Sequence, residues 1–284
     1  MTSWIWMEGT DVAIADPIAA LDDHDDRPSV KDLIEENREH IDKIKAEIAE
    51  DSHYNPTKHD DLWLLRFLLS HKKKLTPSVK AARTTLAFRH EHRLDAEDLR
   101  DYPMDRTTVK CPPGSIILED LKAFMRNVAE NLITYGIPDP RRGVVGYLCL
   151  GGVDQNLLVE HLDEKAWLGA MCFLSEWTHQ WLDYITRTTG RLTKTVRLLD
   201  TEFYKISNFS REGSRRDGVV ANQMEDCYPQ LLEKIFLCNP PVWAQKEPKG
   251  EETTLRYVSE ENLAARFGGK IDDWPVSFEN PKVK

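Results

Sequence analysis

The sequence lacks the motifs that carry nucleotide chemistry and hydrolysis in many enzymes. It has no glycine-rich phosphate loop followed by Lys-Ser or Lys-Thr, and no G-x-S-x-G nucleophile turn. His90 and His92 flank a single residue, so on a helix they point to different faces and cannot share one zinc ion. The carboxylates around His24 lack the alternating spacing of a calcium loop. We therefore predict no catalytic residue, no metal site and no cofactor.

The sequence also lacks a long hydrophobic run. Its longest apolar region, residues 143–153, is much shorter than the roughly 20 residues that span a bilayer, and no leader with a charged and then an apolar part opens the chain. The cysteines are odd in number and widely spaced, which is typical of a reducing compartment. They are Cys111, Cys149, Cys172, Cys227 and Cys238. We expect a cytoplasmic protein that contacts membranes only at their surface.

Basic residues are scarce except in one stretch. The net charge of −10 argues against a nucleic-acid partner, since phosphate backbones are bound by basic surfaces. Residues 66–93 nevertheless hold eight basic side chains and one acidic one, a net charge of +7, which leaves −17 for the remainder. This stretch is either the solvated face of two helices or a patch that faces anionic lipid, where each Lys or Arg contributes ~1 kcal/mol.

The first part of the chain is predicted to be helical after an irregular acidic tail over residues 1–28. Ser29 is a typical N-cap for one helix that continues to about residue 50, because its isoleucines recur at helical spacing. A second helix is predicted over 60–71. Thr76 and Pro77 are typical of the start of a third helix, which carries an apolar stripe. We assign residues 29–110 to an N-terminal helical region.

Strands alternate with helices beyond residue 110. Helices are predicted over 118–135 and 163–188, then up to about Tyr228, and briefly between Ser259 and Gly268. The predicted strands are 144–150, 195–200, 234–239 and 253–258. This alternation predicts an α/β fold with a mostly parallel sheet over residues 111–272, followed by a tail over 273–284. The carboxyl ends of the predicted strands carry apolar residues and prolines rather than nucleophiles. We therefore expect a binding protein and not an enzyme.

Several separated motifs resemble the CRAL-TRIO lipid-binding family, to which phosphatidylinositol and phosphatidylcholine transfer proteins belong. Leu65-Arg66-Phe67-Leu68 and Phe88-Arg89 resemble parts of its helical segment, and "RRGVVGYLCLGGVD" and "TKTVRLLD" resemble two of its strands. The most specific match is "YPQLLEKIFLCNPPVW", in which Tyr228-Pro229, a strand and Asn239-Pro240-Pro241 follow in the family's order. The likeness covers about residues 58–270. It implies that the predicted α/β region has the fold of this family.

The resemblance implies a non-enzymatic protein that binds a phospholipid or similar hydrophobic ligand and transfers it between membranes. Acyl chains would cover the sheet, where each buried methylene is worth ~0.8 kcal/mol. A phosphoinositide-related ligand is implied, although phosphatidylcholine, sterol-like and tocopherol-like ligands stay open. The alternative is a protein-interaction or regulatory module that kept the fold without efficient lipid exchange. The implied partners are therefore the lipid and, transiently, a membrane surface, and the oligomeric state is left open.

Three groups of residues follow from the resemblance. The head-group residues are Gln230, Thr253 and Arg256. Gln230 replaces a family glutamate, and Arg256 replaces a lysine and either chelates phosphate or faces solvent. The pocket and sheet-floor residues are Tyr147, Leu198, Phe236, Cys238 and Trp243. The membrane-facing basic residues are Lys72, Lys73 and Lys74.

The sequence departs from the family between Pro241 and Thr253. The segment "VWAQKEPKGEE" is shorter and more charged than the family's amphipathic gate helix, and such a loop does not cover an apolar cavity. Three explanations stay open. Lipid exchange has been lost, another segment such as residues 1–20 shields the cavity, or the sequence is an incomplete gene model.

Overall fold

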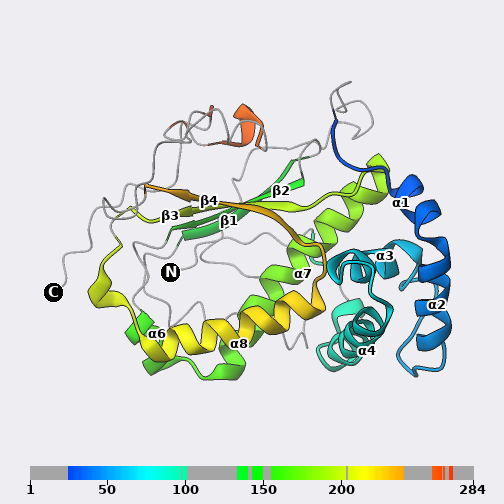
Figure 1. The fold of residues 1–284 in the computed structure, drawn as a ribbon. Helices are drawn as coiled ribbons and strands as arrows, with labels where there is room; N and C mark the ends of the chain where they lie inside the picture. The colour runs from blue at the N-terminus through cyan, green and yellow to red at the C-terminus, as the bar shows by residue number, and fades with distance from the viewer. Residues whose placement is uncertain are drawn as a thin grey trace.

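A computed structural model of the chain describes residues 25–96, 98–100, 133–139, 143–149, 155–202, 204–239, 258–263, 265, 269 and 270. These residues form a helical bundle next to a four-stranded sheet that has long helices on one side (Figure 1). The fold class predicted from the sequence is confirmed, because an N-terminal set of helices precedes a sheet with three parallel strands.

The bundle consists of α1 (Val30–Glu36), α2 (Arg38–Ile48), α3 (Asp61–Ser70) and α4 (Leu75–Glu91). Ser29 caps α1 as predicted, with its Oγ accepting from the N–H of Asp32. The single helix predicted after Ser29 is wrong, since the backbone leaves helical geometry at Asn37. There the side-chain amide donates to the carbonyl of Leu33, a local bond by which asparagine competes with the helix.

The start of α4 also differs from the prediction. Lys72 and Lys73 both have positive φ angles, of 53° and 61°, and Lys74 is the N-cap residue without a side-chain hydrogen bond. Thr76 is therefore not the cap, and it lies with Pro77 in the first helical turn. Proline is tolerated there because first-turn N–H groups have no partner within the helix.

The bundle core lies between α2, α3 and α4. Ile41, Ile44 and Ile48 are fully buried, as the helical spacing predicts, and they cluster with the apolar side of α3. On α3 every residue from Leu62 to Leu68 is buried, including Arg66. The helix is buried on all sides because the bundle covers one face and α7 lies along another.

The sheet has the strand order β1-β2-β3-β4. Its strands are β1 (Ile133–Asp139), β2 (Gly143–Cys149), β3 (Thr195–Asp200) and β4 (Leu232–Cys238). β2, β3 and β4 are parallel, and β1 pairs antiparallel with β2. The strands predicted over 144–150, 195–200 and 234–239 are confirmed within one or two residues at each end.

β1 was not predicted. The end of a helix at Tyr135 and a connection over 136–143 were expected, but Ile133–Asp139 forms a strand that pairs antiparallel with β2. Pro138 is compatible with β1 because the strand is at the edge of the described sheet, where a missing N–H breaks no ladder on the open side. The rest of the predicted helix over 118–135 lies outside the described residues.

The remaining helices are α6 (Gln155–His161), α7 (Glu164–Thr189) and α8 (Arg211–Cys227), with single 3-10 turns at η1 (Leu94–Ala96), η3 (Ile206–Asn208) and η5 (Glu260–Asn262). The helix predicted over 163–188 is confirmed as α7, which Asp163 caps and which ends at Gly190 in left-handed geometry. α7 and α8 lie on the same side of the sheet (Figure 1). Among the described helices none is long and apolar enough to cross a membrane.

The chain that enters α1 is fastened to the segment between α7 and β3. The N–H of Val30 donates to the carbonyl of Gly190 over 2.9 Å, and the N–H of Leu192 donates to the carbonyl of Pro28 over 2.8 Å. The Arg27 guanidinium donates to the Thr193 hydroxyl. Residues 27 to 30 therefore join the bundle directly to the α/β region.

We expect the bundle core to dominate the stability of the N-terminal half. The Ile44→Ala variant should lower the free energy of unfolding by about 2 to 5 kcal/mol, because it leaves a cavity among α2, α3 and α4. Chemical denaturation measures this loss. The control is Glu35→Ala at an exposed position of α1, which should change stability by no more than about 0.5 kcal/mol. Equal losses in both variants would contradict the described packing.

Candidate functional site

The two faces of the sheet differ in what they carry. Tyr147, Leu198 and Phe236 are partners across β2, β3 and β4, so these positions share one face, here called the closed face. Gly146, Arg197 and Ile235 are partners in the next row, as are Leu148, Leu199 and Leu237. These two rows define the opposite face, here called the floor face.

The floor face is turned toward α7 and α8. Val144 lies two residues before Gly146 on β2 and therefore shares its face. Val144 belongs to the same buried cluster as Leu182 of α7 and Val220 of α8. Figure 1 shows these two helices on a single side of the sheet.

The closed face is well covered along β3. Val196, Leu198 and Asp200 are all buried there, and Leu198 has no exposed surface. Phe236 and Cys238 lie opposite Leu198 and Asp200 in register. The predicted pocket residues on β3 and β4 therefore occupy the closed face rather than the floor face. Tyr147 lies in the same register row as Leu198 and Phe236. Trp243 lies outside the described residues.

The floor face exposes apolar side chains on β4. Ile235 and Leu237 are 48% and 52% exposed, although both are large hydrophobic residues within a strand. Covering apolar surface of this kind is worth about 25 cal/mol per Å². Two neighbouring half-exposed aliphatic side chains on one face of a strand are suited to contact an apolar ligand.

Sequence reasoning missed these floor residues, yet a signal was present. In β3 the alternate positions Val196, Leu198 and Asp200 are buried, whereas Arg197 and Leu199 on the other face are partly buried; Thr195, at the start of the strand, is buried as well. A period of two therefore separates the faces. Without the positions of α7 and α8, the sequence did not indicate which set faces a ligand.

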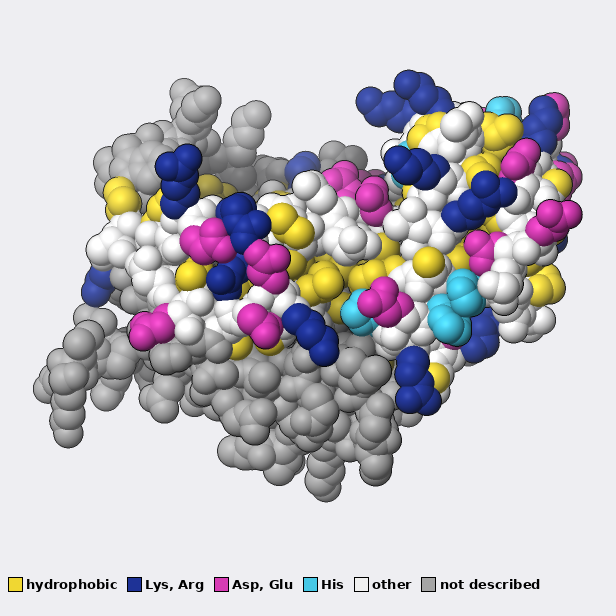
Figure 2. Space-filling model, turned by 90° about the horizontal axis from the view of Figure 1, so that it is seen from below, with side chains coloured by type: hydrophobic (Ala, Val, Ile, Leu, Met, Phe, Trp, Pro, Cys, Tyr) yellow, Lys and Arg dark blue, Asp and Glu magenta, His cyan; other side chains and the backbone are white. Residues whose placement is uncertain are grey.

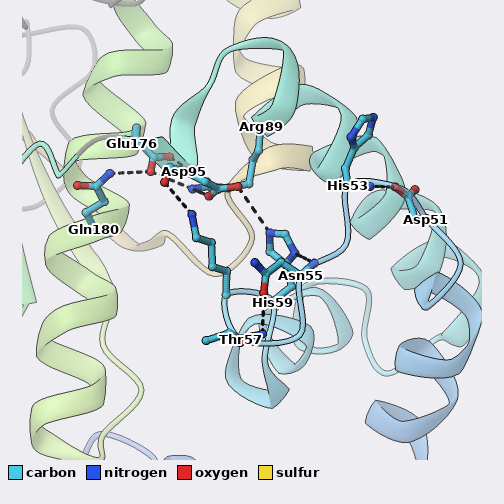
Figure 3. Close-up of polar contacts among 10 residues, drawn as sticks. Asp51, His53, Asn55, Thr57, His59, Arg89, Asp95, Glu176 and Gln180 are labelled. Carbon is cyan, nitrogen blue, oxygen red and sulfur yellow. Dashed lines mark hydrogen bonds and ion pairs between the residues drawn. The ribbon is translucent and has the colours of Figure 1, made fainter.

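A buried ion network joins the bundle to α7 (Figure 3). Arg89, at the end of α4, donates to both oxygens of Glu176 in the middle of α7, over 2.9 and 3.1 Å. It also donates to Oδ1 of Asp95 in η1 through two nitrogens, over 2.8 and 2.6 Å. Gln180, one helical turn after Glu176, donates to the same carboxylate over 2.9 Å. Paired charges of this kind satisfy groups that would be costly to bury alone.

Asp95 is held by further groups from the loop between α2 and α3. The Nδ1 atom of His59 accepts from the N–H of Asn55, so the proton of the neutral ring lies on Nε2, which is 3.7 Å from Oδ2 of Asp95. Lys58 donates to the Asp95 carbonyl over 2.8 Å. Burial acts to raise the pKa of both Asp95 and Glu176, but the Arg89 guanidinium and the hydrogen bonds outweigh it and hold each pKa below its ordinary value.

The other buried titratable groups near this network are held neutral. Burial raises the pKa of the Cys172 thiol to about 12 and that of the Cys227 thiol to about 11, and it raises the pKa of Tyr228 well above its ordinary value. Burial lowers the pKa of His179 to about 4. Thiols and a phenol in this state are poor nucleophiles. This cluster therefore supports the structure rather than a reaction.

Gln230, a predicted head-group residue, is tied to the bundle. It follows the buried Tyr228-Pro229 pair and has a positive φ of 59°. Both its backbone N–H and its side-chain amide donate to Oγ of Ser70, each over 3.1 Å. The structure thus places Gln230 between the end of α3 and the start of β4. Thr253 and Arg256 lie outside the described residues.

The basic stretch of residues 66–93 carries less surface charge than its sequence indicates. Arg66 and Arg89 are buried, and burial lowers the pKa of Arg66 to about 10. Lys73 pairs with Glu36 over 2.6 Å. Lys72 and Lys74 are exposed beside it. Figure 2 shows basic and acidic side chains interspersed on one face of the molecule, rather than a patch of one sign.

Comparisons of the chain with known proteins gave structural similarity and no sequence match. No family description matches it, and no curated protein matches it. Among solved structures, the crystal structure of Sfh5 is similar with a TM-score of 0.49 and 13% sequence identity, over 87% of this chain and 89% of that chain. This similarity is distant, and we infer the function from the residues of this chain.

Within the described residues, no group of three or more His, Cys, Asp or Glu side chains is arranged to hold a metal ion.

The ion network generates a prediction about stability. The Glu176→Gln variant should lower the free energy of unfolding at pH 7 by about 3 kcal/mol, because it removes the charge that faces the buried Arg89. Both carboxylates have lowered pKa values in the folded state. Their stabilisation is therefore complete above the unfolded pKa of about 4 and is lost as the pH falls toward the folded value.

Urea titrations between pH 7 and pH 3 measure this dependence. The stability of Glu176→Gln should fall less steeply with decreasing pH than that of the wild type, while Glu35→Gln, at an exposed position, should follow the wild type. Parallel curves for Glu176→Gln and the wild type would show that Glu176 is not ionised in the folded protein.

Proposed function

We propose that this protein binds a phospholipid or similar amphiphile without chemical turnover and transfers it between membranes, as a member of the CRAL-TRIO lipid-binding family. The observation that carries this proposal is the floor face, where Ile235 and Leu237 are about half exposed on the side of the sheet that Val144 turns toward α7 and α8. An acyl chain on this face removes both its own surface and that of the strand from water, at ~0.8 kcal/mol per buried methylene.

The finer assignments form part of the same proposal. The ligand is phosphoinositide-related, with Gln230, Thr253 and Arg256 as head-group residues, and the protein is cytoplasmic and meets membranes transiently. The position of Gln230 supports this, because its N–H donates to Ser70, just before the turn formed by Lys72, Lys73 and Lys74, here called the lysine turn. Burial of Cys172, Cys227 and Tyr228 in neutral form supports a role without catalysis.

A second candidate function is a regulatory module that keeps the fold without lipid exchange. The bond between Gln230 and Ser70 favours it, since this bond occupies the side-chain amide that would otherwise meet a head group. The two candidates differ in whether lipid is bound.

Native mass spectrometry of the protein purified from cells should show a bound lipid. The Leu237→Glu variant should lose it, because a carboxylate on the floor face must be desolvated against an acyl chain. Val219→Glu is the matched control, since Val219 of α8 is 54% exposed and Leu237 is 52% exposed, and it should keep the lipid. A wild type that is free of lipid and does not move lipid between vesicles would favour the regulatory module.

The lysine turn should direct the protein to anionic membranes. Replacing Lys72 and Lys74 together with alanine should weaken binding to vesicles that contain phosphatidylserine by about 1 kcal/mol per lysine, and the loss should shrink as salt is raised. Vesicle co-sedimentation measures it. Lys31→Ala removes an exposed charge from α1 and serves as the control. An equal loss in the control would assign the effect to net charge rather than to the turn.

A further inference from the structure

Arg197 is a cation without a counter-charge on the floor face. It lies in the middle of β3, and its side chain is partly buried. In the described part of the chain it has no ion pair, hydrogen bond or ring contact, and burial lowers the pKa of its guanidinium with no carboxylate to oppose the shift. The nearest acidic position along β3, Asp200, belongs to the closed face.

The other buried arginines show what is unusual here. Arg89 donates to two carboxylates, and Arg66 donates to the Thr186 hydroxyl over 3.1 Å and lies in the field of Asp183 and Asp60. Burying a charged group without a partner is costly, so proteins normally pair it. Among the described residues, the side chain of Arg197 has no such partner.

The positions beside Arg197 on β2 and β1 are glycines and carry no side chain. Gly136 of β1, Gly146 of β2 and Arg197 of β3 are successive partners in one register row, so two neighbouring strands carry no side chain next to the arginine. A β-carbon added at Gly146 would lie 3.5 Å from Cγ of Arg197, which shows that the bare strip borders the arginine stem. Glycine inside a strand often marks a place where a ligand approaches the backbone.

The same row continues into apolar surface. On the other side of Arg197 its partner is Ile235, and Leu237 follows two residues later on the same face. Both are about half exposed. The floor face therefore offers a cation, an open strip on one side of it and an aliphatic surface on the other, which matches an amphiphile with one anionic group and a hydrocarbon part.

We propose that Arg197 binds the phosphate of a phospholipid that lies on the floor face, with the phosphate over the strip of Gly136 and Gly146 and the acyl chains over β4. The planar guanidinium donates two parallel hydrogen bonds to phosphate oxygens, which a lysine cannot reproduce. This inference rests on the proposed lipid-binding function. It places the charged group inside the fold, at a residue distinct from Gln230, Thr253 and Arg256.

The test compares a ligand that carries a phosphoinositol head group with one that ends in a free hydroxyl. Binding of dioleoyl phosphatidylinositol and of dioleoylglycerol to the full chain is measured by native mass spectrometry and by displacement of a fluorescent acyl probe. The wild type should prefer the phospholipid by about tenfold or more, as expected for a charge-assisted pair. Arg197→Leu should bind dioleoylglycerol like the wild type and lose the preference, and Arg197→Lys should keep part of it.

Two further measurements keep the outcomes distinct. Without ligand, Arg197→Leu should unfold at the same or a higher temperature than the wild type, because it removes an unpaired cation, and only the wild type should gain thermal stability from phosphatidylinositol. Gly146→Leu should block the phospholipid. Gly146→Ala should be tolerated, since the added carbon makes an ordinary contact and the Gly146 backbone is not in the left-handed region.

A preference that persists in Arg197→Leu overturns the inference and leaves lipid binding intact. Tighter binding of oleate than of phosphatidylinositol also overturns it, because the anion would then be a carboxylate. A wild type that binds none of the three lipids overturns the proposed function itself.

Discussion

The pairing of Arg89 with Glu176 and Asp95 is the interaction on which the arrangement of this protein depends. It connects the end of the last bundle helix to the middle of α7, and all its charged groups are compensated within a few side chains. Isolated charges in such a place would be costly, so the loss of one partner weakens the attachment of the bundle to α7. Because α7 is fixed in this way, the position of the floor face relative to the helices is fixed as well.

Two buried arginines and the partly buried Arg197 form a series in which the compensation decreases. Arg89 has two carboxylates, Arg66 has a hydroxyl and more distant charges, and Arg197 has no partner among the described residues. The first two lie between the bundle and α7, where the protein is closed to solvent. The third lies on a sheet face with half-exposed apolar neighbours. The arginines with protein partners thus lie at structural contacts. The arginine without one lies on the surface that we assign to a ligand.

Local sequence signals predicted the elements that are governed by local chemistry. The Asp163 cap and Gly190 end define α7, and the apolar glycine-bounded run defines β2. β1 was missed because its pattern contains Gly136 and Pro138, and it becomes a strand only through pairing with β2. The break at Asn37 was missed because the isoleucine spacing continues through it. The sequence also identified the strands of the candidate site, but the choice between their faces depends on where α7 and α8 pack, which no local pattern encodes.

The hydrogen bonds between residues 27 to 30 and residues 190 to 193 have a mechanical consequence. They anchor the start of the bundle just before β3, while Arg89 anchors its end to α7. Because the bundle is bonded to the α/β region near both of its ends, it is not free to rotate about a single connection. If the protein binds lipid as proposed, we expect the movement that opens the sheet to occur in other parts of the chain rather than in the bundle.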